Sequence, residues 1–327
     1  MSEVSRRALI AGATAAAGSG LFGINELRAQ SYASSDVHFI SAFAAGAGGD
    51  VTVRFFAEKM RPMLGRNVIV DNKVGAGGNI ATEYVARSKP DGHTIYLMSI
   101  ALIAANQHVL MKPTVDLEKE LQVFGTISRT PYLIVVPNNS PYQSIVEFTE
   151  AVKNKGEKAS YGLAGGGAFR VTGEMYKAKA GLRAVEVAYK SSAGFMNDLL
   201  SGAIDYAIAD SGFALAQEKQ GQLRILAAST PERMQSIPHV PTLMESGYPV
   251  SLIGWWGGLV PSGTPRPIVE QLNRMLSEVV SSDDGKKFLD SISADPWIQT
   301  PDQGQSFMRE EIKNWGDYVK IANLPKQ

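Results

Sequence analysis

The segment VHFISAFAAGAGGD, residues 37–50, carries the pattern from which we predict the fold. Its first seven residues, 37–43, are mainly apolar, which is typical of a buried strand. A glycine-rich turn follows at residues 44–49, and we expect a helix from about Asp50, with Pro62 ending or kinking it. Behind the turn, apolar side chains recur at helical spacing: Val53, Phe56, Ala57 and Met60.

The same order of strand, glycine-rich turn and helix is repeated directly afterwards. The predicted elements are the strand NVIVDN (67–72), the turn and helix start KVGAGGNIAT (73–82) and the strand TIYLMS (94–99). In the second helix we expect Ile80, Tyr84 and Val85 to face the core. This alternation of strands and helices predicts a parallel sheet with right-handed crossovers.

The pattern restarts further along the chain. A predicted strand ends at Pro137, Ser144 and Glu147 have the spacing of a helix-capping box, and residues 165–167 form a third glycine turn behind another strand. We therefore predict an α/β protein of two lobes, with a ligand cleft at the carboxyl ends of the strands. The predicted ranges are 34–137 and 225–327 for lobe 1, and 138–224 for lobe 2.

The first 33 residues have a different character. Arg6 and Arg7 precede the mild apolar run ALIAGATAAAGSGLFGI, and small residues follow around Ala29 and Ala33. This is the arrangement of a cleavable export signal, and two adjacent arginines are typical of the twin-arginine route. We predict that residues 1–33 are such a signal peptide.

Composition excludes several classes of function. Lys+Arg and Asp+Glu are both 32, so the chain lacks the basic excess of a nucleic-acid-binding protein. Cysteine is absent, which excludes disulfides and thiolate metal sites. The four histidines lack metal-ligand spacing, and no serine lies in a G-x-S-x-G elbow. We therefore expect no metal, no cofactor and no catalytic residues, although an enzyme is not excluded.

The glycine turns predict a binding site for an anion smaller than a nucleotide. A phosphate-binding Walker loop needs Lys and Ser/Thr after its glycines, whereas Gly49 is followed by Asp50 and Gly78 by Asn79. Backbone N–H groups beside a helix N-terminus can instead hold a carboxylate. The alternative is that the glycines only permit tight turns, and that Asp50 and Asn79 only cap helices.

Five segments together resemble a known family. They are FAAGAGGD (43–50), VDNKVGAGGNIATEYVARSKPDGHTIYLMS (70–99), YKSSAGFMNDLLSGAIDYAIADS (189–211), LRILAASTPERMQSIPHVPTLMESGYP (223–249) and WWGGLVPSGTPRPIVEQLN (255–273). They are similar to the Bug/TctC-type periplasmic solute-binding proteins, the receptors of tripartite tricarboxylate transporters. The resemblance implies a type II periplasmic-binding-protein-like fold whose two lobes close on a carboxylated ligand.

The resemblance also implies the residues of the ligand site. In the first lobe they come from the three strand ends, and in the second lobe from the third glycine turn and two later strand ends. The predicted ligand-binding residues are Phe43, Ala45, Gly46, Ala47, Gly48, Gly49, Gly77, Gly78, Asn79, Ser99, Gly166, Gly167, Ala168, Phe169, Arg170, Tyr189, Lys190, Ser191, Ser192 and Asp210.

Two departures from the family pattern leave the ligand open. Ala44, Ala45 and Gly49 stand where prolines and a threonine are usual, and residues 168–170 replace a stretch usually closer to serine, proline and histidine. Arg170 could grip a second carboxylate bidentately, and Phe169 could contact a ring or methylene chain. A dicarboxylate or an aromatic acid is therefore expected, with a solvated Arg170 as the alternative.

As partners, the resemblance implies a small organic carboxylate and the membrane permease subunits of a tripartite tricarboxylate transporter. It further implies a monomer in the periplasm, with no nucleic acid bound. Two other functions stay open: an exported enzyme that acts on a carboxylate, and an exported ligand-sensing protein with a signalling partner.

Overall fold

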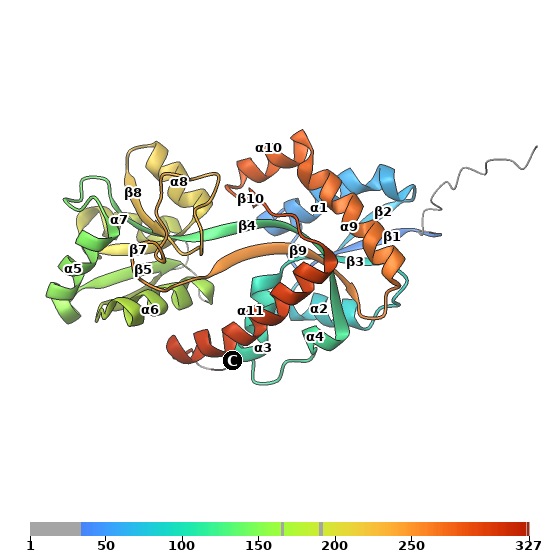
Figure 1. Ribbon diagram of the computed structural model, residues 1–327, viewed down its shortest axis with the longest axis horizontal. Coiled ribbons are helices and arrows are strands. Elements are labelled where there is room, and N and C mark those ends of the chain that lie inside the picture. The colour runs from blue at the N-terminus through green and yellow to red at the C-terminus, as the bar shows by residue number, and fades with distance from the viewer. Residues whose placement is uncertain (1–33, 165–166, 190–191, 325, 327) are drawn as a thin grey trace, which may run out of the picture. The chain divides into compact units, whose positions relative to one another are not determined.

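The computed structural model describes residues 34–164, 167–189, 192–324 and 326, and Figure 1 gives their arrangement. The predicted signal peptide, residues 1–33, lies outside these residues. Within the described part of the chain, no helix is both long enough and apolar enough to cross a membrane.

The first sheet contains the strands predicted around the opening segment. It is built from β1 (Val37–Ser41), β2 (Val68–Asn72), β3 (Thr94–Ser99) and β9 (Ile253–Pro261). β1 lies between β2 and β3 and runs parallel to both, whereas β3 pairs with β9 in the antiparallel sense. The predicted parallel arrangement of the first three strands is confirmed.

One long strand, β4 (Leu121–Pro137), belongs to both sheets. Its first part pairs with β9 as far as Pro131, and with the short β10 (Asp295–Pro296). From Tyr132 onward it pairs with strands of the second sheet. The predicted end at Pro137 is confirmed, but the sequence pattern gave no sign that the strand begins at Leu121. Figure 1 shows β4 and β9 side by side along their shared length.

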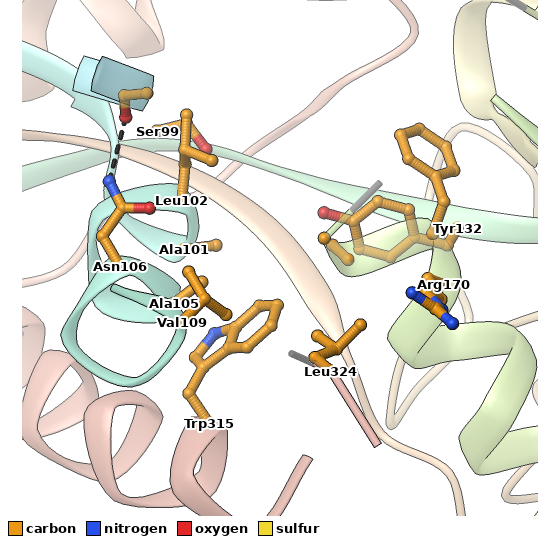
Figure 2. Close-up of a pocket in the computed structure, with 14 residues that line it drawn as sticks. Ser99, Ala101, Leu102, Ala105, Asn106, Val109, Tyr132, Arg170, Trp315 and Leu324 are labelled. Atoms are coloured by element: carbon orange, nitrogen blue, oxygen red, sulfur yellow. Dashed lines mark hydrogen bonds between the residues drawn. The ribbon is translucent and has the colours of Figure 1, made fainter. Parts of the chain in front are cut away.

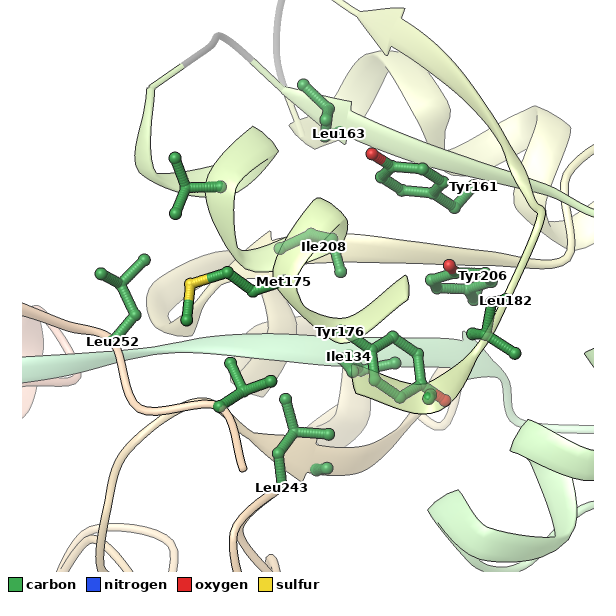
Figure 3. Packing of buried hydrophobic residues seen from close by; sticks show 14 of the residues in the cluster. Ile134, Tyr161, Leu163, Met175, Tyr176, Leu182, Tyr206, Ile208, Leu243 and Leu252 are labelled. Atoms are coloured by element: carbon green, nitrogen blue, oxygen red, sulfur yellow. The ribbon is translucent and has the colours of Figure 1, made fainter. Parts of the chain in front are cut away.

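The second sheet has mostly parallel strands around a core rich in tyrosine. β7 (Tyr206–Asp210) lies between β4 and β5 (Ser160–Ala164), and β5 continues to β6 (Val185–Tyr189). Within the core the rings of Tyr161 and Tyr206 stack at a centroid distance of 5.3 Å. Figure 3 shows these rings among Ile134, Leu163 and Ile208. The two sheets confirm the predicted two-lobed α/β fold.

The predicted return of the chain to the first lobe, at residue 225, falls within a strand of the second sheet. β8 (Leu223–Ala228) pairs with β4 inside the second sheet. Leu243 and Leu252, which follow it, pack in the tyrosine-rich core of the second lobe. We propose that the return takes place through β9 instead, so that the second lobe extends to residue 252.

Helices cover the two sheets. They are α1 (Gly48–Leu64), α2 (Asn79–Ala86), α3 (Ile100–Val109), α4 (Leu117–Glu120), α5 (Ile145–Lys155), α6 (Ala168–Ala180), α7 (Met196–Ser201), α8 (Ser211–Lys219), α9 (Arg266–Ser281), α10 (Asp283–Ser291) and α11 (Pro301–Ile321). The predicted α1 stripe of Val53, Phe56, Ala57 and Met60 is fully buried. Pro62 does not end α1, which continues to Leu64 and is terminated by Gly65 in the left-handed conformation.

The predicted buried face of α2 is wrong at two of three positions. Val85 is buried, but the side chains of Ile80 and Tyr84 are 50% and 43% exposed. The buried face consists of Val85 with the small residues Ala81 and Thr82. Small side chains let the helix approach β3 closely, so here the need for close packing outweighed side-chain hydrophobicity.

The C-terminal helix α11 connects the two lobes. It packs against α3 of the first lobe, α6 of the second, and β4, which runs through both. The sequence predicts an apolar stripe of Phe307, Ile312, Trp315 and Val319 on this helix. Only Trp315 is buried, whereas the other three are half-buried against the core. The buried face also contains Glu311, an acidic residue that the apolar pattern did not identify.

Candidate functional site

A cavity of about 540 Å³ lies between α3 and α6 and is closed on a third side by α11. β4 contributes Tyr132 to its wall (Figure 2). The cavity lies at the carboxyl end of β3, as expected for a ligand site in an open α/β sheet. Its lining residues are Gly77, Ser99, Ala101, Leu102, Ala105, Asn106, Val109, Tyr132, Gly167, Ala168, Phe169, Arg170, Trp315 and Leu324.

The N-terminus of α3 lies at one end of this cavity, where Ser99, Ala101 and Leu102 line it. Ser99 precedes the first turn of α3, and no side chain caps that helix. The first backbone N–H groups of a helix have no partner within it, and they carry the positive end of the helix dipole. The first turn of α3 contains no acidic residue either. This end of the cavity is therefore suited to an anion.

Asn106 fixes the second glycine turn beside these amides. Its side chain is buried, and Nδ2 donates to the carbonyl oxygen of Gly77 at 3.0 Å and to Oδ1 of Asn79 at 3.3 Å (Figure 2 shows the first bond). Gly77 and Gly78 have φ of 59° and 94°, which side chains with a Cβ rarely adopt. The backbone of this turn therefore favours glycine at both positions.

Aromatic rings form the opposite wall. Tyr132 stands at the point where β4 passes from one sheet to the other, and Phe169 meets it edge to face with ring centroids 5.1 Å apart. Burial, and then the charge of Glu311, raise the pKa of the Tyr132 hydroxyl above its usual range. That hydroxyl stays protonated at neutral pH and can donate a hydrogen bond.

Arg170 is the only charged residue among the described residues that line the cavity. Its Nε lies 2.9 Å from Oε2 of Glu186 on β6, and its side chain is 36% exposed. The contact is an ion pair without a well-aligned hydrogen bond. Glu186 also accepts a hydrogen bond from the hydroxyl of Tyr161 at 3.3 Å. Arg170 thus reaches the cavity wall, as one of the two sequence-based interpretations predicts, but with its charge already compensated.

The first glycine turn does not line this cavity. Its conformation is held by Asp50, whose buried carboxylate accepts hydrogen bonds from the backbone N–H of Gly46 and from Nε of Arg54, both at 2.8 Å. Burial alone would raise the pKa of Asp50, but hydrogen bonds from Arg54, Gly46 and Asn72 lower it to about 2. Asp50 lies inside α1 rather than capping it, since the N-cap is Ala47.

Phe43 connects this turn to the cavity indirectly. Its ring stacks on Trp256 of β9 at a centroid distance of 5.5 Å. Trp256 pairs in register with Ser99 of β3. The turn therefore lies one strand away from the amide end of the cavity.

Most of the predicted residues from the later strand ends also lie away from the cavity. Asp210 caps α8 by accepting from the N–H of Phe213 at 2.8 Å, and it accepts from the hydroxyl of Ser192 at 2.7 Å. The Tyr189 hydroxyl donates to Asp198 at 2.6 Å. Three further predicted residues lie outside the described residues: Gly166, Lys190 and Ser191.

The structure therefore separates the predicted site into two groups. The predicted residues that line the cavity are Gly77, Ser99, Gly167, Ala168, Phe169 and Arg170. The sequence pattern missed Asn106, Leu102, Tyr132 and Trp315, because they meet only through packing of α3, β4 and α11. Asn106 could have been indicated by its place as the first polar residue after the apolar run IALIAA (100–105).

The lining offers groups for binding rather than for catalysis. Apart from Arg170, its polar side chains are those of Ser99, Asn106, Tyr132 and Trp315. Across the described ranges, no group of three or more His, Cys, Asp or Glu residues could hold a metal ion. The cavity can therefore hold the anionic group of a ligand at one end and the uncharged part of the ligand between its apolar walls.

Comparison with known proteins decides the family. The family model of the tripartite tricarboxylate transporter family receptor, TctC, matches residues 52–324. The chain belongs to this receptor family. The predicted Bug/TctC family is confirmed, since protein BugT of Bordetella pertussis is 28% identical over 295 residues, which cover 89% of this chain and 90% of BugT.

Solved structures of TctC-like receptors agree with the fold. A protein of R. palustris with adipate has a TM-score of 0.71 and 28% identity, covering 89% of this chain and 98% of that one. MatC from Rhodopseudomonas palustris with bound malate has a TM-score of 0.66 and 25% identity, covering 88% and 99%. The matched family is one of receptors. A further solved neighbour, the periplasmic binding protein BugD, has a TM-score of 0.69 and 30% identity, covering 90% of this chain and 100% of that one.

Proposed function

We propose that this protein is a periplasmic receptor that captures a small organic carboxylate in the cavity between α3 and α6. It delivers the ligand to the permease subunits of a tripartite tricarboxylate transporter. The observation that carries this proposal is the uncapped N-terminus of α3, which opens onto the cavity beside Ser99 without an acidic side chain in its first turn. Membership of the TctC family supports it.

The carboxylate binds to backbone amides at the start of α3, with Ser99 and the turn held by Asn106 completing its surroundings. A negative charge near a helix N-terminus gains about 0.3–1 kcal/mol, and up to about 2 kcal/mol where it is partly buried. Hydrogen bonds to a charged group each contribute about 1.5–3 kcal/mol. Two or three such bonds are enough for binding of a small anion.

The two lobes close around the bound ligand. β4 and β9 are the strands that run between the sheets, so bending within them lets the walls formed by α3 and α6 approach each other. We include the first glycine turn, residues 43–49, in the closed site, because Phe43 stacks on the strand that pairs with Ser99. Tyr189, Ser192 and Asp210 belong to the same closed state in this proposal.

Export follows from the predicted signal peptide. Residues 1–33 direct the chain across the inner membrane, and the adjacent Arg6 and Arg7 select the twin-arginine route. Changing both to Lys tests the route, because a precursor that is still processed normally uses the general secretory pathway instead.

A thermal-shift screen tests the proposed function. Purified protein is melted with a library of carboxylates and with the matching amides, and each mixture is analysed for products. A carboxylate at a hundredfold its Kd should add about 2.7 kcal/mol of stability, whereas its amide should add much less. Equal shifts for acid and amide, or conversion of the ligand, would contradict a carboxylate receptor.

A further inference from the structure

The cavity has apolar walls on two sides. On the α3 side these are Leu102 and Val109, and Trp315 of α11 continues the same surface (Figure 2). On the α6 side Phe169 stands against Tyr132. Leu102 is 39% exposed although it is a large apolar residue. Such concentrated apolar exposure inside a concave site is typical of contact with an apolar part of a ligand.

The size of the cavity points in the same direction. A volume of about 540 Å³ lies within the range of pockets that enclose whole organic ligands. The amides near Ser99 occupy only one end, and a bare carboxylate such as acetate would leave the walls uncovered. A ligand that fills the site therefore carries a ring or a chain.

The far wall is electrically balanced without a ligand. Arg170 is paired with Glu186 at 2.9 Å, and the neighbouring Glu174 is paired with Lys177 at 2.7 Å. Two positive and two negative side chains thus lie together around Tyr161, whose hydroxyl donates to Glu174 at 2.7 Å. A second carboxylate on the ligand would have to displace Glu186 from Arg170 while facing two acids.

We propose, building on the proposed carboxylate receptor, that the ligand is a monocarboxylate with an apolar body, either an aromatic ring or an aliphatic chain. The carboxylate lies at the start of α3, and the body lies between Leu102 and Trp315 on one side and Phe169 on the other. This choice disfavours the dicarboxylate that the sequence also suggests.

A matched panel of ligands tests the proposal by titration calorimetry. Hexanoate and adipate both have six carbons, but only adipate has a second carboxylate. Phenylacetate and acetate both have one carboxylate, but only phenylacetate carries a ring. Hexanoate or phenylacetate should bind at least tenfold more tightly than acetate and than adipate. Adipate binding more tightly than hexanoate, or acetate matching phenylacetate, would overturn the proposal.

A charge variant tests the role of the Arg170 ion pair. Glu186→Gln frees the guanidinium and should raise the affinity for adipate at least tenfold while leaving that for hexanoate unchanged. Glu150→Gln removes the partner of Lys153 on the exposed side of α5 and serves as the control. Unchanged adipate binding in Glu186→Gln would show that the ion pair does not exclude a second acid.

A polar substitution tests the apolar wall. Leu102→Asn should weaken phenylacetate binding at least tenfold and leave acetate binding nearly unchanged. Leu200 on α7 is similarly exposed, at 41%, and does not line the cavity, so Leu200→Asn is a matched control. Melting curves verify that both variants fold. Equal phenylacetate affinity in both would mean that the ligand does not touch this wall.

The panel separates failure of this inference from failure of the proposed function. If dicarboxylates bind and monocarboxylates with apolar bodies do not, the receptor function stands and the inferred ligand class is wrong. If the amides of hexanoate and phenylacetate bind as tightly as the acids, the carboxylate site itself is wrong and both proposals fall.

Discussion

Replacing the buried Glu311 with glutamine should remove a strong pH dependence of stability. Glu311 lies on α11 with 4% of its surface exposed, and neither its Oε2 atom nor the indole N–H groups of Trp255 and Trp315 form well-aligned hydrogen bonds with described residues. Burial, and then the charge of Glu310, raise the pKa of Glu311 from 4.5 to about 7, although both indoles lower it slightly.

The size of the effect follows from that pKa. In the unfolded chain Glu311 titrates near 4.5, so below this pH the carboxyl is protonated in both states and its contribution is fully present. As the pH rises from 4.5 to about 7, the carboxyl ionises in the unfolded chain but stays protonated in the buried folded site, so stability is lost; above about 7 both states are ionised and the loss no longer grows. At 1.36 kcal/mol per pKa unit, the loss is about 3 kcal/mol between pH 4.5 and about 7.

Urea unfolding at several pH values between 4.5 and 8.5 measures this loss. The difference in free energy of unfolding between Glu311→Gln and the parent cancels the other titrating groups, and it should grow by about 3 kcal/mol over this range. Glu310→Gln, at the exposed neighbouring position, should keep the pH dependence and move it slightly lower. A Glu311→Gln difference that stays constant with pH would refute a raised pKa at this position.

Three further predictions concern the two glycine turns. Asn106→Ala should lower the free energy of unfolding by about 1–3 kcal/mol, because two hydrogen bonds to the second turn are lost. The affinity for the carboxylate should fall as well, and an unchanged affinity would mean that this turn is not part of the binding site. Gly77→Ala should destabilise the fold by about 1 kcal/mol, because φ at this position is 59°. Gly48→Ala should leave stability unchanged, because a Cβ at this position would lie in open space. Equal melting temperatures of the two variants would contradict this difference. Asp50→Asn should lower the free energy of unfolding by about 2 kcal/mol at pH 7. The pKa of Asp50, lowered from 3.8 to about 2, stabilises the fold above pH 3.8, and this stabilisation is lost as the pH falls through 2. An unchanged free energy of unfolding in urea at pH 7 would contradict this prediction.

The sequence predicts local elements well where one physical factor dominates. The strand Thr94–Ser99 and the end of β4 at Pro137 follow from short apolar runs next to turn-forming or proline residues. The face of α2 could not be predicted in the same way, because close packing against β3 selected Ala81 and Thr82 over Ile80. The beginning of β4 at Leu121 depends on pairing with β9, more than 120 residues away in the sequence.

The candidate site could be predicted only at its strand ends. Ser99 ends β3, Gly77 lies in the turn after β2, and Arg170 follows the third glycine turn. Their positions in the sequence are therefore enough to predict that they lie near the cleft. Leu102 and Trp315 become site residues only because α3 and α11 pack together. The pairing of Arg170 with Glu186 likewise depends on the packing of α6 against the second sheet.

Hydrogen exchange of the backbone amides is the most direct test that the cavity holds a carboxylate at the start of α3. The protein is measured alone and saturated with the tightest-binding carboxylate of the panel. We predict that protection increases at residues 76–79 and 99–102, because Gly77, Ser99, Ala101 and Leu102 of these two segments line the cavity. Saturation by the ligand without added protection in these two segments would contradict the proposed site.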